Sequence, residues 1–384
     1  MLFASPLPDL EDSRVTIEIH QMRSDLTDVL RTPRRWTGLL RRTSAARNIQ
    51  GSNTIEGYTV TDADAAAAVD DEPPLSADEK TWAEIKGYQR VMTYVLNVGT
   101  TPGFVTDETA IRAMHFILLE HDLASSPGRY RDGTIYVRDE SKATNVYTGP
   151  EAERVPTLMR AFADWLAEPS TEDPMVRAAM AHLNLVLIYP FKDGNGRMAR
   201  ALQTLVLARD GVGEPVFSSI EEWLGHNTQD YYDVLAATAQ GSWNPSNDTA
   251  PWLKFNLRAH HMQAQTVRRR FAEAEKQWSA IDELLRDHHL DERLGSALFD
   301  ANLGLRVTRP SYIKLTGLDS RTATRDLVAA AEAGLLEARG ERRGRYYVAG
   351  RPLAELQAHL RSLRTPLVDP YPTLRREIRS STPD

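Results

Sequence analysis

A short stretch at residues 189–200, YPFKDGNGRMAR, brings together residue types that are suited to holding an anion. Gly194 and Gly196 permit backbone conformations that are closed to other residues, so successive N–H groups can converge on one point. An acidic side chain and two arginines lie in the same stretch. We therefore predict a loop that binds an anion, most simply a phosphate group.

This loop needs two helices to position it, and the flanking sequence predicts both. Residues 175–188 are apolar almost all round, as in a buried helix, and residues 198–207 form a second apolar segment. Pro190 ends the first helix, because proline cannot donate a backbone hydrogen bond and disfavours helix before it. The second helix begins at the loop, so its free N–H groups and the positive end of its dipole face the same point.

The same stretch resembles the signature of the Fic (Fido) family, His-Pro-Phe-x-Asp/Glu-Gly-Asn-Gly-Arg-x-x-Arg. It matches at every position but the first, where Tyr189 replaces the histidine. The resemblance implies a mainly α fold, in which a helical Fic core carries a small β-hairpin flap. It also implies a reaction in which a protein hydroxyl attacks the α-phosphate of ATP, releases pyrophosphate and becomes attached to AMP.

Carried over position by position, the resemblance implies ATP and Mg²⁺ as ligands. Asp193 matches the acidic residue that holds Mg²⁺ on the phosphates, a hard oxygen ligand for a hard cation. Arg197 and Arg200 match the arginines that take the β- and γ-phosphates. The residues that match the anion hole and the aromatic side chain packing the loop inward are Gly194, Asn195, Gly196 and Phe191.

The one departure, Tyr189, falls on the residue that carries the family's chemistry. Histidine titrates near neutrality and can accept the proton of the attacking hydroxyl. A tyrosine with a pKa near 10 is ionised in only about one molecule per thousand at pH 7. Loss of a positioned general base typically costs about 10²- to 10⁴-fold in rate. We therefore expect a nucleotide-binding protein related to protein adenylyltransferases, with weak or absent AMP transfer.

Several functional alternatives stay open at this point. The chain is a pseudoenzyme whose ATP-loaded state regulates a partner, or Tyr189 acts as a weak base or is itself modified. In a further alternative, protonated Tyr189 serves as a general acid while Glu56 orients water, which makes a phosphodiester hydrolase that removes AMP from a target. A transcription regulator with a nucleotide-sensing Fic domain is an answer of a different class.

Residues 52–57, Ser-Asn-Thr-Ile-Glu-Gly, have the pattern of a helix that ends at a glycine cap. In a Fic protein they also resemble the inhibitory motif Ser/Thr-x-x-x-Glu-Gly/Asn, with Ser52, Glu56 and Gly57 at its defined positions. The resemblance implies that Glu56 pairs with Arg200. A carboxylate there occupies the place of the terminal phosphate, because both groups bind the same guanidinium donors.

Two further segments resemble parts of the family's site. Asp132-Gly133 is a strong turn signal followed by β-prone residues, so we expect a small hairpin at residues 129–138. In the family this hairpin docks the target protein by strand addition, and a hairpin without function is the alternative. Tyr231 and Tyr232 resemble the aromatic residues that border the adenine, with core packing as their alternative.

The segment 290–350 differs in kind from the rest, because short helical segments are followed by two β-prone segments around a turn. It resembles a winged helix-turn-helix, with Arg321 and Arg325 one turn apart on the recognition helix and more arginines on the wing. Such positions suit phosphate contacts, which makes DNA a candidate partner through residues 318–345. Protein binding and dimerisation are the alternatives.

The remaining organisation follows from periodicity and composition. We expect single helices at residues 15–42 and at 106–121, the latter capped by Thr106. The proline-containing end, from residue 366 on, is expected to be a loosely attached extension. The predicted segments are an N-terminal helical region with the inhibitory helix at 1–75, a Fic core at 76–289, the winged helix-turn-helix at 290–350 and a tail at 351–384.

Overall composition limits the classes of protein. The formal net charge of −7 argues against nucleic-acid binding over the whole surface of the 384 residues. The absence of cysteine excludes disulfides and thiolate metal sites. The first ten residues lack a basic region followed by a long apolar run, and no stretch approaches the roughly 20 apolar residues of a membrane helix. We therefore predict a soluble, cytoplasmic protein without a membrane partner.

Overall fold

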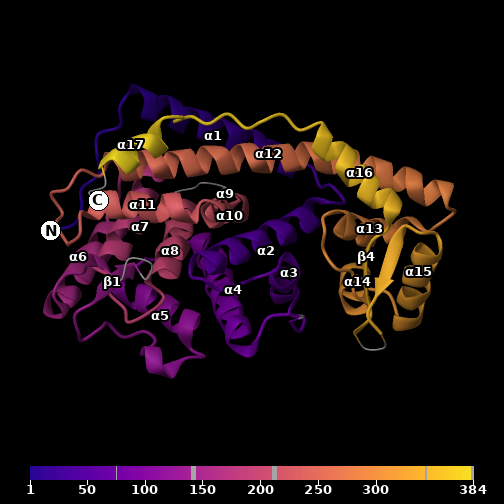
Figure 1. Ribbon diagram of the computed structural model, residues 1–384, viewed down its shortest axis with the longest axis horizontal. Coiled ribbons are helices and arrows are strands. Elements are labelled where there is room, and N and C mark those ends of the chain that lie inside the picture. Colours follow the sequence, from indigo (N-terminus) through magenta and orange to yellow (C-terminus); the bar gives the residue numbers. More distant parts are fainter. Residues whose placement is uncertain (75, 140–143, 210–213, 342–343, 382–384) are drawn as a thin grey trace.

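Two buried helices, α7 (Pro174–Ile188) and α8 (Asn195–Arg209), lie within the larger helical part of the molecule and are joined by the glycine-containing loop (Figure 1). Asp173 caps α7 by accepting a hydrogen bond from the backbone N–H of Met175, and Pro174 occupies the first turn. The α7 residues from 175 to 188 are all buried. The computed structural model describes residues 1–74, 76–139, 144–209, 214–341 and 344–381.

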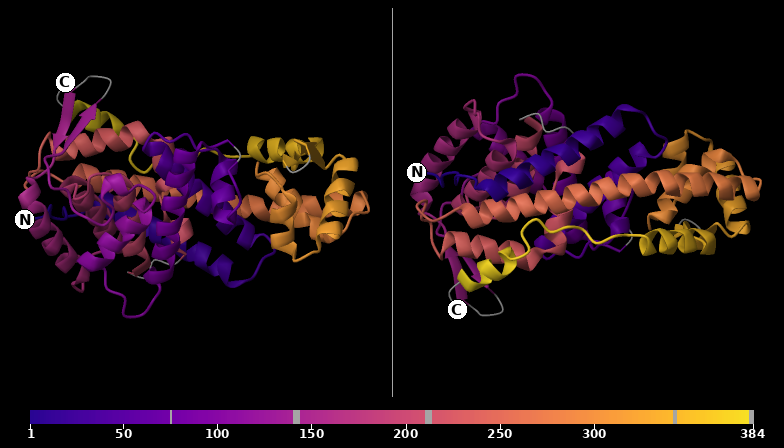
Figure 2. Two further views of the ribbon diagram at one scale, coloured as in Figure 1. Left: turned by 90° about the horizontal axis from the view of Figure 1, so that it is seen from below. Right: turned by 90° about the horizontal axis from the view of Figure 1, so that it is seen from above.

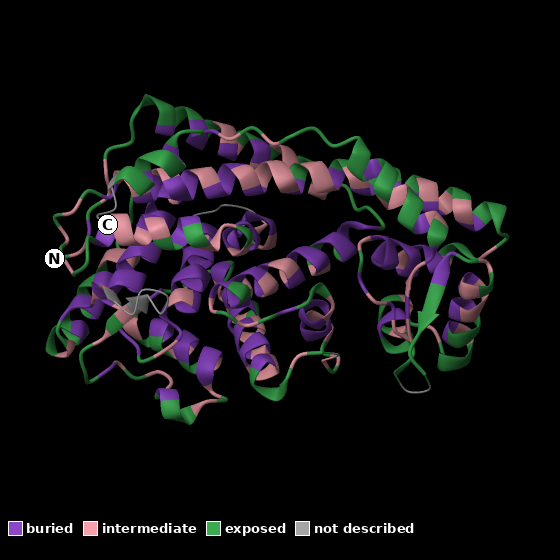
Figure 3. Ribbon diagram, viewed as in Figure 1, coloured by how far each residue is buried: buried purple, intermediate pink, exposed green. Residues whose placement is uncertain are grey.

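Further helices pack around this pair, so that buried residues concentrate at the centre and exposed ones on the outer helices (Figure 3). This arrangement confirms the predicted mainly α fold with a small hairpin. Among the described residues, no helix combines the length and the apolar character that spanning a bilayer demands. The surrounding helices are α1 (Leu10–Arg31), α2 (Thr37–Ile55), α3 (Asp62–Asp70), α4 (Glu79–Gly99), α5 (Glu108–Leu119), α6 (Val155–Ala167), α9 (Pro215–Ser218), α10 (Glu221–His226) and α11 (Thr228–Ala239).

Two helix boundaries differ from the sequence-based expectation. The single helix predicted at 15–42 is divided between α1 and α2, because Thr32, which precedes Pro33, adopts an extended conformation. Helix α5 is capped by Asp107 rather than Thr106, since the Asp107 carboxylate accepts a hydrogen bond from the N–H of Ala110.

The hairpin lies further along the chain than predicted. It consists of β1 (Tyr136–Asp139) paired antiparallel with β2 (Thr144–Thr148), so the expected range 129–138 includes three of the four residues of β1 and none of β2. Residues 140–143, which connect the two strands, lie outside the described residues, and Asp132-Gly133 precedes both strands. The Asp-Gly segment is instead held beside the signature loop, where Arg131 donates its backbone N–H to the Pro190 carbonyl and a side-chain N–H to the Gly133 carbonyl.

The longest helix, α12 (Ala250–Asp287), runs from the helical core to a C-terminal unit of residues 290–350 (Figures 1 and 2). The strands of this C-terminal unit form an antiparallel pair, and Val307 adds an isolated antiparallel bridge to Tyr347. Its elements are α13 (Gly295–Asn302), α14 (Arg309–Thr316), α15 (Ser320–Glu332), β3 (Leu336–Arg339) and β4 (Tyr346–Ala349).

The tail is not a loosely attached extension, and that prediction was wrong. After α16 (Arg351–Ser362) the chain runs back beside α12 and ends in α17 (Leu374–Ser381), which packs on α11 and α12 (Figure 2). Tyr371 is buried and donates a hydrogen bond of 2.8 Å from its hydroxyl to Asp12. Leu374 and Ile378 are also buried, so apolar packing anchors a segment whose prolines suggested a free end.

Candidate functional site

Helix α7 ends at Tyr189, which adopts the left-handed conformation with φ +50°. Its N–H donates the last bond of the helix to the Leu185 carbonyl at 3.1 Å. A left-handed conformation costs a residue with a Cβ atom about 1–2 kcal/mol, so the surrounding packing must hold it. The signature loop therefore begins with a sharp change of chain direction, as the proline at position 190 predicted.

One residue that holds this turn, Arg131, was missed by the sequence analysis. Its Nε donates to the Tyr189 carbonyl at 2.8 Å, and its backbone N–H donates to the Pro190 carbonyl at 2.9 Å. Further guanidinium bonds reach the carbonyls of Gly133 and Pro150. Arg131 thus joins the loop to the segments on both sides of the hairpin. Nothing in the local sequence distinguishes it from the neighbouring Arg129.

The middle of the loop is closed by Asn195. Its Oδ1 accepts from the Phe191 N–H at 3.0 Å, and its Nδ2 donates to the Phe191 carbonyl at 2.9 Å. The Phe191 ring is fully buried and stacks on His115 with centroids 3.7 Å apart. The Asn195 side chain therefore shapes the loop, and the predicted inward packing of Phe191 is the geometry observed.

His115 supports the loop from α5 and remains neutral. Its Nδ1 accepts from the Gly128 N–H at 2.8 Å, which leaves Nε2 as the donor to the Asp193 carbonyl at 3.0 Å. Burial lowers the pKa of His115 to about 4. This histidine is therefore a hydrogen-bonded core residue.

The glycines allow the backbone to approach other groups closely. Gly194 has φ +75°, and its N–H bonds to Oδ1 of Asp193 at 2.6 Å. Helix α8 starts at the next residue. A Cβ atom on Gly196 would lie 2.6 Å from Oε1 of Glu56 and 3.2 Å from Nη1 of Arg200. Glycine at 196 is thus required by the contact between Glu56 and the loop.

Arg200 is held by the end of α2. Its Nη2 donates to Oε1 of Glu56 at 2.6 Å and to the Ser52 carbonyl at 3.0 Å, while its Nε donates to Oγ of Ser52 at 2.8 Å. Glu56 itself is the C-cap of α2, followed by Gly57 with φ +84°. The side chain of Arg200 is 1% exposed and that of Glu56 is 22% exposed. The structure therefore brings Ser52, Glu56 and Arg200 together as the resemblance implied.

Arg197 has a different partner, which the sequence analysis also missed. Glu84 of α4 forms an ion pair with Nη1 of Arg197, and the two side chains are only 5% and 1% exposed. Glu84 also accepts a hydrogen bond of 2.9 Å from the hydroxyl of Tyr58. Asp193 lies further away, with Oδ2 3.6 Å from Nη2 of Arg197. The charge of Arg197 is thus balanced from within the protein.

Each of the two arginines nevertheless keeps an unused donor. Among the described residues, Nε of Arg197 and Nη1 of Arg200 are buried without a hydrogen-bond partner. A buried guanidinium N–H that lacks an acceptor costs about 1–3 kcal/mol, so such groups point to an acceptor that the protein does not itself supply. An anionic oxygen at the loop would satisfy them.

The environment of Tyr189 makes its phenol a poor base. Burial first, and then the negative charges of Glu56 and Asp193, raise the pKa of Tyr189 to about 12. At pH 7 only about one phenol in 10⁵ is then ionised. The value near 10 for an unperturbed tyrosine therefore overestimates the fraction of ionised phenolate in this site.

The residues at the loop fit a Mg²⁺ ion that arrives with phosphates. Within the described residues no group of three or more His, Cys, Asp or Glu side chains is arranged to hold a metal. Asp193 is the residue of the loop itself that offers a carboxylate, and its side chain is 48% exposed. Mg²⁺ is commonly bound through one or two carboxylates plus substrate phosphates, so this donor set suits a shared site rather than a protein cage.

The two tyrosines predicted beside the adenine have different surroundings. Tyr231 is buried in the core, with its hydroxyl 2.9 Å from Nε2 of His182. Tyr232 is 43% exposed, and its hydroxyl donates to the Ile55 carbonyl at 3.0 Å. Tyr232 therefore lies next to Glu56, whereas Tyr231 packs in the core, which was the alternative prediction for this residue.

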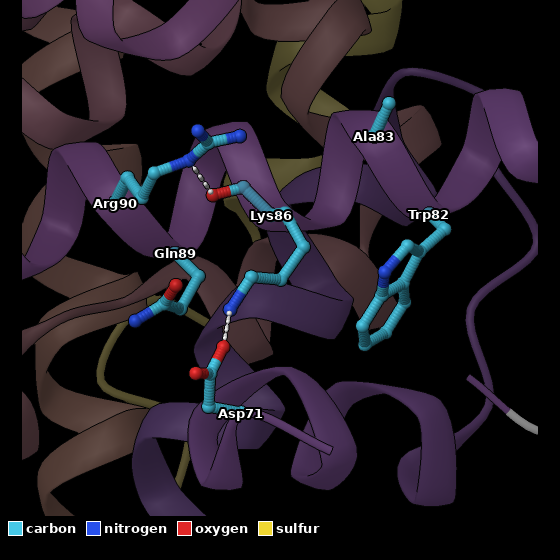
Figure 4. A pocket seen from close by; sticks show the side chains of 6 residues that line it. All are labelled: Asp71, Trp82, Ala83, Lys86, Gln89 and Arg90. Carbon is cyan, nitrogen blue, oxygen red and sulfur yellow. Dashed lines mark hydrogen bonds and ion pairs between the residues drawn. The ribbon is translucent and has the colours of Figure 1, made fainter. Parts of the chain in front are cut away.

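A pocket of about 600 Å³ lies away from this loop, between the end of α3 and the outer face of α4 (Figure 4). Both of its cations are already paired, because Lys86 bonds to Asp71 at 2.9 Å and Arg90 bonds to Glu120. Each of these two cations therefore already has an anionic partner. The glycine-containing loop remains the candidate site.

Comparisons with known proteins agree with this geometry. Residues 105–207 match the sequence model of the Fic/DOC family. The chain is 31% identical over 219 residues to "Protein adenylyltransferase Fic" of Nematostella vectensis, covering 55% of this chain and 46% of that protein. It is 35% identical over 137 residues to "Protein adenylyltransferase fic-1" of Caenorhabditis elegans, covering 35% and 24%. The chain thus spans less than half the length of these relatives.

Solved structures show the same fold. A Fic family protein from Desulfovibrio desulfuricans G20 aligns with a TM-score of 0.56 and 26% identity, over 91% of this chain and 98% of that one. Fic-1 from C. elegans aligns with a TM-score of 0.53 and 22% identity, over 67% and 71%. The first alignment includes almost the whole chain, and the second shows the fold alone.

Proposed function

We propose that this chain, whose residues 105–207 form a Fic/DOC family domain, binds a nucleotide such as ATP at the loop of residues 189–200 and is held closed by Glu56. One observation carries the proposal: Glu56 bonds to Nη2 of Arg200, while Nη1 of the same guanidinium is buried and has no partner in the described part of the chain. A terminal phosphate offers several acceptor oxygens and can satisfy both nitrogens at once. Its relatives named protein adenylyltransferase support ATP as the nucleotide.

Nucleotide binding requires the side chain of Glu56 to move away from Arg200 while Arg200 and Arg197 keep their positions. Glu56 is partly exposed at the end of a helix and has one charged partner, so its side chain can swing away. Ser52 and Glu84 are buried and keep Arg200 and Arg197 in place. The start of α8 adds its free N–H groups and its dipole to the attraction for phosphate.

We further propose that AMP transfer by this chain is weak. In such a transfer the oxygen of a protein hydroxyl bonds to the α-phosphorus, the bond to the β-phosphate breaks, and pyrophosphate leaves with the bonding electrons. Mg²⁺ at Asp193 would neutralise charge on the phosphates. The proton of the attacking hydroxyl needs an acceptor, and Tyr189, with a pKa of about 12, takes it poorly. We therefore expect the domain to bind the nucleotide but to transfer AMP slowly.

Calorimetry on the full chain tests the binding proposal. Glu56→Gly with Mg²⁺ and ATP should give micromolar-range affinity, whereas the unchanged chain should bind at least about tenfold more weakly because Glu56 competes. Adding Arg200→Met to Glu56→Gly should abolish that binding. A folded Glu56→Gly variant that gives no heat with ATP would contradict the proposal.

We propose that a target protein docks on β1. The other strand is already covered, because the Thr148 N–H donates to the Gly241 carbonyl and the Trp243 N–H donates to the Thr148 carbonyl. Within the described residues β1 pairs only with β2, so its outer edge is open to strand addition. The docking segment expected at 129–138 is thereby replaced by residues 136–139.

A second candidate function, DNA binding, concerns the C-terminal unit, which we propose to be a winged helix-turn-helix. Arg321 and Arg325 of α15 and Arg345 of the wing are exposed, so three cations are available to phosphates. The other wing arginines, Arg342 and Arg343, lie outside the described residues. A mobility-shift assay on the full chain should show DNA binding at low salt that weakens as salt rises. The double change Arg321→Ala, Arg325→Ala should remove it, while Arg351→Ala should not. No shift at low salt contradicts this function.

A further inference from the structure

Helix α2 reaches from the candidate nucleotide site to the C-terminal unit (Figure 1). Its last turn provides Ser52, and its C-cap Glu56 contacts Arg200. At its other end, Trp36, Leu39 and Leu40 are buried in a hydrophobic cluster that also contains residues of α12, α13 and α15. Helix α2 thus contributes residues both to the candidate nucleotide site and to the hydrophobic cluster of the C-terminal unit.

Arg42 fixes the distant end of α2 by an ion triad. Its Nη1 bonds to Asp70 of α3 at 2.7 Å, and its Nη2 bonds to Asp300 of α13. The three side chains are 12%, 12% and 3% exposed. A buried guanidinium held by two carboxylates from separate elements is a directional contact, because movement of α2 in either direction breaks one of the pairs.

The parts of the chain that carry the two carboxylates are themselves joined without Arg42. Thr308 of the C-terminal unit donates a hydrogen bond of 3.0 Å to Glu72, just after α3. Lys314 of α14 donates to the carbonyl of Asp70 at 2.8 Å. The end of α3 and the C-terminal unit therefore form one support, and Arg42 attaches α2 to it.

Between Arg42 and Glu56, α2 crosses α10 at a close backbone contact. A Cβ atom on Gly51 would lie 2.2 Å from the Glu221 carbonyl oxygen, and one on Gly225 would lie 2.6 Å from Cα of Gly51. This contact sets the separation of the two helices near the middle of α2. Arg42 adds an attachment to the C-terminal unit about 13 Å further along the helix axis.

We propose that Arg42 is a positioning residue for Glu56, through which the C-terminal unit keeps the nucleotide site closed. The proposal rests on the proposed function, in which Glu56 competes with a phosphate for Arg200. Arg42 lies about 21 Å from Glu56 along α2 and touches no nucleotide, so its effect passes through the orientation of the helix. Anything that moves α13 away from α2 opens the site, and nucleotide binding in turn loosens the triad by the same factor.

The experiment measures ATP affinity with Mg²⁺ by calorimetry on the full chain. Arg42→Met, which keeps the length of the side chain, should tighten binding at least tenfold relative to the unchanged chain. In a Glu56→Gly background the same change should alter affinity less than twofold, because no closed state is left to disturb. Asp300→Asn should act in the same direction and is nearly isosteric, which covers the case in which Arg42→Met fails to fold.

The matched control is Arg41→Met. Arg41 precedes Arg42 on α2 but is 44% exposed and pairs with Glu214 at 2.6 Å, so its removal should leave ATP affinity unchanged. Folded Arg42→Met and Asp300→Asn variants that bind ATP as weakly as the unchanged chain would overturn the proposal. An equal effect of Arg41→Met would also overturn it, since the effect would then be one of charge alone.

Hydrogen exchange separates this proposal from the proposed function. The N–H groups of Gly57 and Tyr58 bond to the carbonyls of Thr54 and Asn53 at the end of α2. Arg42→Met should raise exchange at these amides severalfold in the absence of nucleotide. If Glu56→Gly binds no ATP but exchange rises, the nucleotide function fails and the positioning role stands. Unchanged exchange overturns the positioning role whatever the calorimetry gives.

Discussion

Arg200 donates a 2.6 Å hydrogen bond to Glu56, a residue that lies 144 positions earlier in the chain. The guanidinium is fully buried and stays charged: burial lowers its pKa, but Glu56, together with Tyr231 and Tyr88, more than offsets this effect, so the pKa of Arg200 is raised. In the closed site, Glu56 and Arg200 therefore form an ion pair, and one N–H group of Arg200 has no acceptor among the described residues. That combination makes the contact replaceable by a ligand with more oxygens.

Ser52 is expected to serve the open state as well as the closed one. It is fully buried and accepts from Arg200 twice, through its hydroxyl and its carbonyl. In a Glu56→Gly background, Ser52→Ala should weaken ATP binding roughly tenfold, because a buried hydrogen bond to a charged group contributes about 1.5–3 kcal/mol. Calorimetry measures this, with the exposed Thr54→Ala as control. Unchanged affinity would mean that Ser52 does not orient Arg200.

Restoring a general base at position 189 should restore transfer. With Glu56→Gly and α-labelled ATP, Tyr189→His should raise self-labelling by about 10²- to 10⁴-fold over the variant that keeps Tyr189. Tyr189→Phe is the control of similar shape, and it should label as little as the tyrosine form. Strong labelling by the form that keeps Tyr189 would refute the pKa argument. Its loss in Tyr189→Phe would then identify the phenol as base or acceptor.

Asp300 should give the stability of the protein a measurable pH dependence. Burial, only partly offset by Arg42, raises the pKa of Asp300 to about 6. The folded state then binds more protons than the unfolded state, so this contribution to stability is full below about pH 4 and is lost as pH rises through 6. Its size is up to about 3 kcal/mol. Comparing urea unfolding at pH 4.5 and 7.5, Asp300→Asn should lose less stability across this range than the unchanged chain; equal losses would contradict the assignment.

The chain's local chemistry was readable from the sequence, because it depends on neighbouring residues. The proline at position 190 and the glycines at 194 and 196 predicted a bend that exposes backbone donors, and Asn195 does begin the following helix. The pattern of residues 52–57 likewise predicted the glycine that ends α2. The resemblance to Fic proteins then supplied the pairing of Glu56 with Arg200, which no local rule contains.

The sequence could not decide which residues from distant parts of the chain contact each other in the folded protein. Glu84 neutralises Arg197 from 113 positions away, and Arg131 anchors the signature loop from 58 positions away. The bonds of Arg131 hold the Asp132-Gly133 segment beside the signature loop, so this segment does not form the expected hairpin turn. The tail that was expected to be free is held in place because Tyr371 and its neighbours are buried. Local propensities differ by about 1 kcal/mol or less per residue, whereas leaving one partner of a buried ion pair unpaired or exposing a packed apolar side chain costs about 2–5 kcal/mol, so tertiary structure decided these points.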